Sequence, residues 1–242
     1  FTAPPCHGVA FFTGTPVDGP GMSPVLGFFA KKIAHGLRQY RLSHPEKYNA
    51  ADNAYYQRLY TAQGPKAILL EAEKKQILGQ SLEKLAMPDL ADPLVKELKA
   101  QARRGAIKQS ALVPSVLPLQ IIRLGRLAIV CAPGEFTTTA GERLRATVEE
   151  SLKDMVDTVL ICTYCNEYMG YVTTFEEYQV QSYEGGHTIF GQWTLAGFQT
   201  CFSQLATQLK QPLAARTHDQ KTRPALPPAH ELNLRSNLAV PR

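Results

Sequence analysis

The stretch that decides the fold is LQIIRLGRLAIVCAPGEFTTTAGERLRATVEESLKDMVDTVLIC, residues 119–162. It begins with two apolar, β-prone runs at 119–124 and 127–132, joined by Gly125-Arg126. A short glycine-containing step between two such runs predicts a tight β-hairpin. The second strand is expected to end at Pro133-Gly134, because proline and glycine both interrupt regular structure.

A helix and a further strand follow the hairpin. The threonines at 137–139 offer N-caps for a helix that runs to about Lys153, and the apolar run 158–162 predicts the next strand. Strand, loop, helix and strand within about forty residues form a βαβ unit, whose two strands lie parallel. We therefore expect an α/β fold with a mixed sheet that contains this unit and packed helices. The apolar positions of the helix fall four residues apart, on one face: Leu144, Val148 and Leu152.

The topology of a βαβ unit places the loops after its two strands at the same edge of the sheet. Glu135 lies in the first of these loops, and the polar and aromatic run 166–171 follows the second strand. Although 36 residues separate Glu135 from Tyr171, we expect the two side chains to lie side by side. From the residues alone, Glu135 could equally serve the helix that follows it, where a carboxylate interacts favourably with the helix dipole.

The rest of the chain divides into a folded part, 1–209, and a tail, 210–242, that is rich in proline and polar residues. We expect the tail to be extended or disordered. The net charge of +5 comes mostly from this tail, so it does not indicate a basic nucleic-acid-binding face. No apolar run approaches the ~20 residues that a membrane span needs. Further predicted elements are short strands at 9–12 and 67–70 and helices at 27–40, 92–104 and 194–209.

The cysteines do not form an obvious disulfide framework, because their number is five and therefore odd. Cys162 and Cys165 make a single C-x-x-C pair. Three of the five cysteines stand in apolar runs, which favours small buried hydrophobic residues. A redox or metal-binding role for the pair is the alternative.

Three motifs together carry a family resemblance. They are GTPVDGPG at 14–21, PGEFTTTAG at 133–141 and NEYMGYVTTFEEYQVQSYEG at 166–185. In this order the motifs are similar to the neutral (alkaline, non-lysosomal) ceramidase family, and the resemblance extends from Gly8 to about Leu209. It implies that the chain is the carboxyl-terminal part of a larger catalytic domain.

The resemblance implies a zinc-dependent amide hydrolase that cleaves ceramide, or a similar N-acyl sphingolipid, to sphingosine and a fatty acid. In the family, zinc is held by two histidines, a glutamate and a tyrosine. The motifs place that glutamate at Glu135 and that tyrosine at Tyr171. Tyr183 matches a tyrosine that hydrogen-bonds the substrate amide, although from the residues alone it could be a buried core tyrosine. The family alone implies a secreted, periplasmic or cell-surface location. It also implies that the protein could act at a membrane surface.

The chain also departs from the family pattern. The two zinc histidines and the active-site serine of the family lie upstream of the first motif, and here only Thr2 to His7 precede the region of resemblance, so we expect those residues to be missing. His7, Ser23 and His187 do not match those positions, and we expect none of them to replace the family residues. We therefore expect an incomplete active site that binds zinc weakly, is inactive alone, and needs a missing N-terminal half as its partner.

Two other functions remain open from the sequence. The chain could be a non-catalytic lipid-binding or interaction module that keeps the fold without the chemistry. It could also be part of an amidase for another N-acyl lipid, because one fold often carries several activities.

Overall fold

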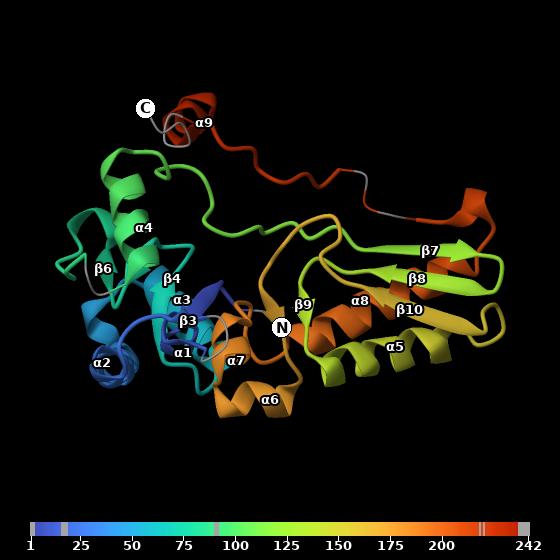
Figure 1. The fold of residues 1–242 in the computed structure, drawn as a ribbon, viewed down its shortest axis with the longest axis horizontal. Helices are drawn as coiled ribbons and strands as arrows, with labels where there is room; N and C mark the ends of the chain where they lie inside the picture. The colour runs from blue at the N-terminus through green and yellow to red at the C-terminus, as the bar shows by residue number, and fades with distance from the viewer. Residues whose placement is uncertain (1–2, 16–18, 90–91, 218, 220, 237–242) are drawn as a thin grey trace.

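The computed structural model describes residues 3–15, 19–89, 92–217, 219 and 221–236. The chain is an elongated α/β structure (Figure 1). One end holds a three-stranded sheet covered on one face by two long helices, and the other end holds a sheet of four shorter strands surrounded by helices. The predicted fold class is confirmed.

The βαβ unit forms as predicted. Strand β7 (Gln120–Leu124) and strand β8 (Leu127–Cys131) make an antiparallel hairpin, and β10 (Thr158–Cys162) pairs in parallel with β8. The strand order is β10-β8-β7, so β8 is central. Gly125 in the hairpin turn has a φ of 60°, a left-handed conformation that glycine adopts without steric cost.

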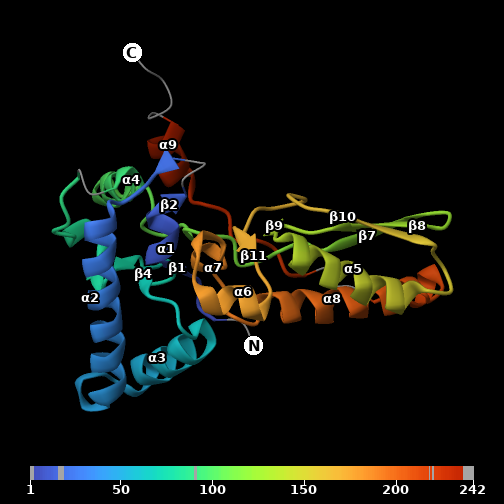
Figure 2. The ribbon, with the colours of Figure 1, turned by 60° about the horizontal axis from the view of Figure 1, so that its bottom comes forward.

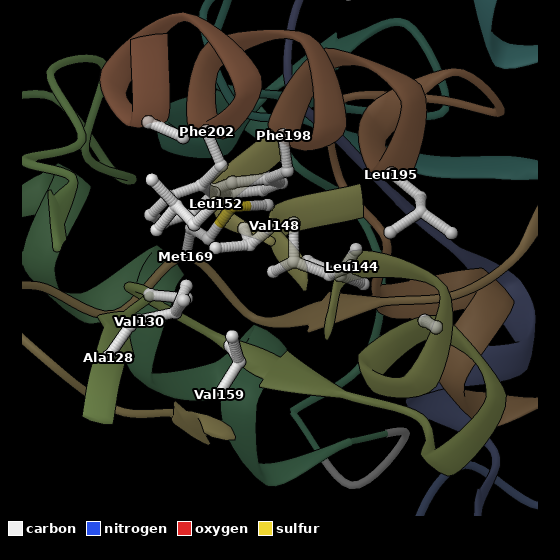
Figure 3. Packing of buried hydrophobic residues seen from close by; sticks show 14 of the residues in the cluster. Ala128, Val130, Leu144, Val148, Leu152, Val159, Met169, Leu195, Phe198 and Phe202 are labelled. Atoms are coloured by element: carbon white, nitrogen blue, oxygen red, sulfur yellow. The ribbon is translucent and has the colours of Figure 1, made fainter. Parts of the chain in front are cut away.

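Two helices cover one face of this sheet. Helix α5 (Thr138–Leu152) and helix α8 (Thr194–Leu209) run side by side beneath the strands (Figures 1 and 2). The Thr137 hydroxyl caps α5 by accepting a hydrogen bond from the Ala140 N–H. The predicted apolar face of α5 is fully buried against α8 and the strands (Figure 3), in a core that includes Val130, Val159, Met169, Phe198 and Phe202.

The amino-terminal part forms a second sheet of four antiparallel strands in the order β1-β4-β5-β6. The predicted strand at 9–12 is wrong, because Val9–Phe12 forms the short helix α1. Four consecutive apolar residues fit a buried helical turn as well as a strand, so periodicity alone cannot separate the two. The elements of this part are β1 (Cys6–Gly8), α2 (Pro24–Ser43), α3 (Ala50–Gln63), β4 (Ile68–Glu71), β5 (Gln76–Ile77), β6 (Gln80–Ser81) and α4 (Pro93–Arg103), with a small β2 (Gly14–Thr15) and β3 (Gly19–Pro20) pair.

The predicted tail is not extended throughout. Helix α9 (Ala229–Ser236) forms near its end and lies beside α4 (Figure 1). The fully buried carboxylate of Glu231 accepts hydrogen bonds from the backbone N–H groups of Gln109 at 2.5 Å and Ser110 at 3.0 Å. The buried position of Glu231 depends on these partners, which lie far away in the sequence, so the composition of the tail could not predict it. Residues 237–242 lie outside the described part.

The helices that the structure describes include none with the length and apolar character needed to span a membrane.

Candidate active site

The two predicted ligand residues meet at the edge of the sheet. Strand β9 (Glu135–Phe136) pairs in parallel with β11 (Tyr171–Val172), and Tyr171 stands directly opposite Glu135. The Glu135 N–H donates to the Gly170 carbonyl at 2.9 Å, and the Thr137 N–H donates to the Val172 carbonyl at 3.0 Å. The predicted proximity of Glu135 and Tyr171 is therefore confirmed.

A glycine makes this close approach possible. A Cβ atom at Gly134 would lie 2.8 Å from the Gly170 carbonyl oxygen, closer than real side chains come to backbone. Gly134, which the sequence marks as a strand end and as part of the second motif, thus also lets the second loop pack against the first. The Met169 N–H donates to the Pro133 carbonyl at 3.0 Å and holds that loop in place.

Tyrosine hydroxyls surround the Glu135 carboxylate. The Tyr168 hydroxyl donates to Glu135 Oε1 at 2.5 Å. Partial burial raises the pKa of Glu135, but hydrogen bonding by Tyr168, Tyr171 and Tyr164 outweighs it, so the net pKa is lowered. Burial and the neighbouring carboxylate raise the pKa values of Tyr168 and Tyr171. At neutral pH the site therefore holds one carboxylate among protonated phenols.

Tyr183 belongs to the same aromatic cluster. It begins helix α7 (Tyr183–His187), and its ring lies 5.8 Å from the ring of Tyr171 and 5.4 Å from that of Phe11, centroid to centroid. The structure thus brings together all three sequence-predicted site residues, Glu135, Tyr171 and Tyr183.

Two histidines whose pairing no sequence motif indicated lie beside this cluster. The His187 ring lies 5.8 Å from the Tyr171 ring and 5.1 Å from the ring of His7 in β1. Among the described residues, neither Nδ1 atom has a hydrogen-bond partner, although both atoms are buried. Burial, reinforced by the charge of Lys66, lowers the pKa of His187 to about 4, so its imidazole is neutral at pH 7. No local motif links these histidines, because β1 and α7 meet only in the folded chain.

A cavity of about 230 Å³ opens beside the histidines. His7, His187 and Tyr168 line its polar side, and leucines from α4 and the following segment line much of the rest. Apolar walls with a few converging polar groups are typical of small-molecule sites.

Ser23 and Tyr178, a residue of the third motif, have structural roles. Ser23 caps α2 by accepting a hydrogen bond from the Leu26 N–H. Tyr178 of helix α6 (Phe175–Val180) is completely buried, and its hydroxyl donates to Gln63. Asp18 of the first motif lies outside the described residues.

The donor set fits a zinc ion only in part. A carboxylate and a phenol are suitable oxygen ligands, and a nearby cation would stabilise their ionised forms. The part of the chain that the structure describes contains no cluster of three His, Cys, Asp or Glu side chains able to hold one metal ion. Glu135 and Tyr171 could therefore supply half of a four-ligand site.

Comparison with known proteins identifies relatives that share the motifs and the fold. The profile of the family described as "Neutral/alkaline non-lysosomal ceramidase, N-terminal" matches residues 97–200, which include the second and third motifs. Neutral ceramidase 3 of Arabidopsis thaliana is 39% identical over 175 residues, covering 68% of this chain and 23% of that protein. Neutral ceramidase A of Dictyostelium discoideum is 43% identical over 128 residues, covering 50% of this chain and 18% of that protein.

A solved structure, "Ceramidase complexed with C2", matches with a TM-score of 0.57 and 26% identity, over 91% of this chain and 28% of that one. The shared α/β arrangement and the matched motifs define a protein of the ceramidase class. The chain belongs to the neutral/alkaline non-lysosomal ceramidase family. It spans about a fifth of the length of the first three curated relatives, at 23%, 18% and 22%.

Proposed function

We propose that the chain forms part of a zinc-dependent amidase that hydrolyses the amide bond of ceramide to give sphingosine and a fatty acid. The observation that carries this proposal is the parallel pairing of β9 and β11, which sets Glu135 opposite Tyr171 at the carboxyl edge of the sheet. Membership of the ceramidase family supports the choice of reaction.

Glu135 and Tyr171 would hold the zinc ion together with ligands from outside this sequence. When bound, zinc would polarise the amide carbonyl and lower the pKa of a bound water. The lowered pKa of Glu135 keeps this side chain ionised at neutral pH, which is the form that binds a cation. Tyr168, whose hydroxyl donates to Glu135, would orient the carboxylate as a partner to a metal ligand commonly does.

Tyr183 would act on the substrate. Its ring lies against that of Tyr171, so a hydroxyl donor stands in the same cluster as the candidate ligands. In amide hydrolysis water adds to the acyl carbon, negative charge develops on the carbonyl oxygen, and the C–N bond breaks as the amine takes a proton. A donated hydrogen bond from Tyr183 would stabilise the developing charge.

We further propose that this chain alone binds zinc weakly and does not turn over ceramide. Catalytic zinc sites generally use three protein ligands and leave one position open. Among the described residues we identify two candidates, Glu135 and Tyr171, and the matched relatives are about three times as long as this chain.

Zinc titration calorimetry tests the ligand assignment. Glu135→Gln keeps the size of the side chain but removes its charge, so zinc affinity should fall by at least the roughly ten- to hundredfold that loss of a residue supporting a ligand costs. Glu142→Gln, at an exposed carboxylate on α5, is the matched control and should leave the affinity unchanged. Equal zinc affinity in wild type and Glu135→Gln would show that Glu135 is not a ligand.

Ceramide turnover tests the reaction. The isolated chain should release no fatty acid, and co-expression with an upstream segment that carries the family histidines and serine should restore release. Ceramide hydrolysis by the isolated chain would contradict the proposal that its active site is incomplete. An associated, zinc-loaded complex that hydrolyses another N-acyl lipid but not ceramide would favour the alternative amidase.

A further inference from the structure

Cys162 and Cys165 lie close together on the surface beside the site. Cys162 ends strand β10 and is exposed, and Cys165 is partly exposed in the loop that follows. Their sulfur atoms are 3.4 Å apart, and both thiols are free. The expectation that a cysteine in an apolar run is buried is therefore wrong at Cys162. Its side chain shares the uncovered face of β10 with Leu160, which is 51% exposed.

The loop between the two cysteines has a defined, strained conformation. Tyr164, between the cysteines, has a φ of 59°, and Asn166, just after them, has a φ of 69°. Asparagine tolerates this left-handed region, but for tyrosine it is uncommon and costs free energy. The positive φ at Tyr164 turns the chain so that Cys165 returns toward Cys162. The Cys165 N–H donates to the Ala132 carbonyl at 3.1 Å and fixes the turn against the neighbouring strand end.

The same turn carries a side chain of the candidate active site. Tyr164 acts on the Glu135 carboxylate by hydrogen bonding, and its ring stacks on that of Tyr168 with centroids 6.0 Å apart. The Tyr164 N–H donates to the Gly134 carbonyl at 3.3 Å, directly before Glu135. A covalent link between residues 162 and 165 would therefore restrain a tyrosine whose ring stacks on Tyr168, the hydrogen-bond donor to Glu135.

We propose that Cys162 and Cys165 form a reversible disulfide that locks the turn bearing Tyr164 next to Glu135. Disulfide formation is independent of the proposed function, whereas its effect on catalysis rests on that function. The oxidant is a small-molecule or protein disulfide. The Cys162 thiolate attacks one of its sulfurs and releases one thiol, and the Cys165 thiolate then attacks the Cys162 sulfur and releases the second. The protein loses two electrons and two protons, and the oxidant becomes two thiols.

Peptide mapping by mass spectrometry tests the link after equilibration in buffers with defined ratios of reduced and oxidised glutathione. The wild type should show a 162–165 linkage that reverses as the ratio rises, and Cys162→Ser should abolish it. Cys201→Ser, at an exposed cysteine on α8, is the matched control and should retain it. Free thiols at both positions in fully oxidising buffer, or a link from Cys162 to its buried ladder neighbour Cys131, would overturn the proposal.

Hydrogen exchange tests the effect on the site without zinc or substrate, so a failed ceramidase assay does not affect it. Closing a loop of this length should slow opening of residues 163–169 by about twentyfold in the oxidised wild type relative to the reduced protein. Cys162→Ser should give the reduced rate in both buffers. If the disulfide forms but the hydrogen-exchange rates of residues 163–169 do not change, the disulfide does not restrain the turn and the proposal is refuted.

Discussion

Tyr178 and Gln63 form a buried polar network that frames the candidate site. The Tyr178 hydroxyl lies 2.9 Å from both the backbone oxygen and the side-chain oxygen of Gln63. Gln63 Nε2 in turn donates to the carbonyls of Pro4 at 2.9 Å and Ile189 at 2.7 Å. Tyr178 and Gln63 are both 0% exposed, so water does not replace these bonds. The network connects α3 to the segments next to β1 and α7. Strand β1 contains His7, and helix α7 contains His187.

Tyr178→Phe should lower the free energy of unfolding by about 1–3 kcal/mol. The substitution keeps the ring but leaves the buried side-chain oxygen of Gln63 without its donor, whereas the Gln63 carbonyl still accepts from the Lys66 N–H at 3.2 Å. An unsatisfied buried acceptor carries roughly that cost. For a chain of this size the melting temperature should fall by roughly 2–12 °C. Urea unfolding followed by circular dichroism measures the free energy, and calorimetry measures the melting temperature.

A matched tyrosine and a double variant make the test specific. Tyr40→Phe removes a hydroxyl from a side chain that is 45% exposed and should change stability by less than about 0.5 kcal/mol. The loss in Tyr178→Phe/Gln63→Leu should be smaller than the sum of the two single losses by about 0.5–3 kcal/mol, because the residues are in contact. If Tyr178→Phe costs no more than Tyr40→Phe, or if the two losses add, the network does not carry the stability inferred here.

Two further predictions concern buried charge. Arg41→Met should cost about 3–5 kcal/mol in urea unfolding, because it leaves the 2% exposed Glu71 without the ion-pair partner that lies 2.6 Å away; a loss below about 1 kcal/mol would contradict this. Burial lowers the pKa of Lys66 to about 7, well below its unfolded value of ~10.4. Between these values the unfolded chain holds the extra proton, so this residue makes stability rise with pH by up to about 1.4 kcal/mol per unit. Lys66→Met should remove that rise between pH 7 and 9, and parallel stability curves for variant and wild type would refute the argument.

The sequence pattern was sufficient where local spacing decides structure. The period of Leu144, Val148 and Leu152 predicted α5, and the β-prone runs on either side predicted the hairpin and the parallel strand. Because a βαβ unit has one handedness, the same pattern predicted that Glu135 and Tyr171 would meet.

Features that depend on distant contacts could not be predicted in this way. The apolar run ending at Cys162 resembles a strand covered on both faces, but helices cover only one face of this three-stranded sheet, so Cys162 is exposed. His7 and His187 meet because β1 packs against α7, and no local sequence pattern around either residue predicts this contact. Helix α9 is held through the buried carboxylate of Glu231, which composition had assigned to a tail.

The parallel ladder between β9 and β11 also links ligand binding to folding. Glu135 and Tyr171 become neighbours only after the intervening helix and strand have closed into the sheet, so the unfolded chain offers no paired site. Any ligand that bridges the two residues therefore binds only the folded βαβ unit and stabilises it against unfolding. At a free concentration of about a hundred times its Kd, such a ligand would add about 2.7 kcal/mol to the free energy of unfolding.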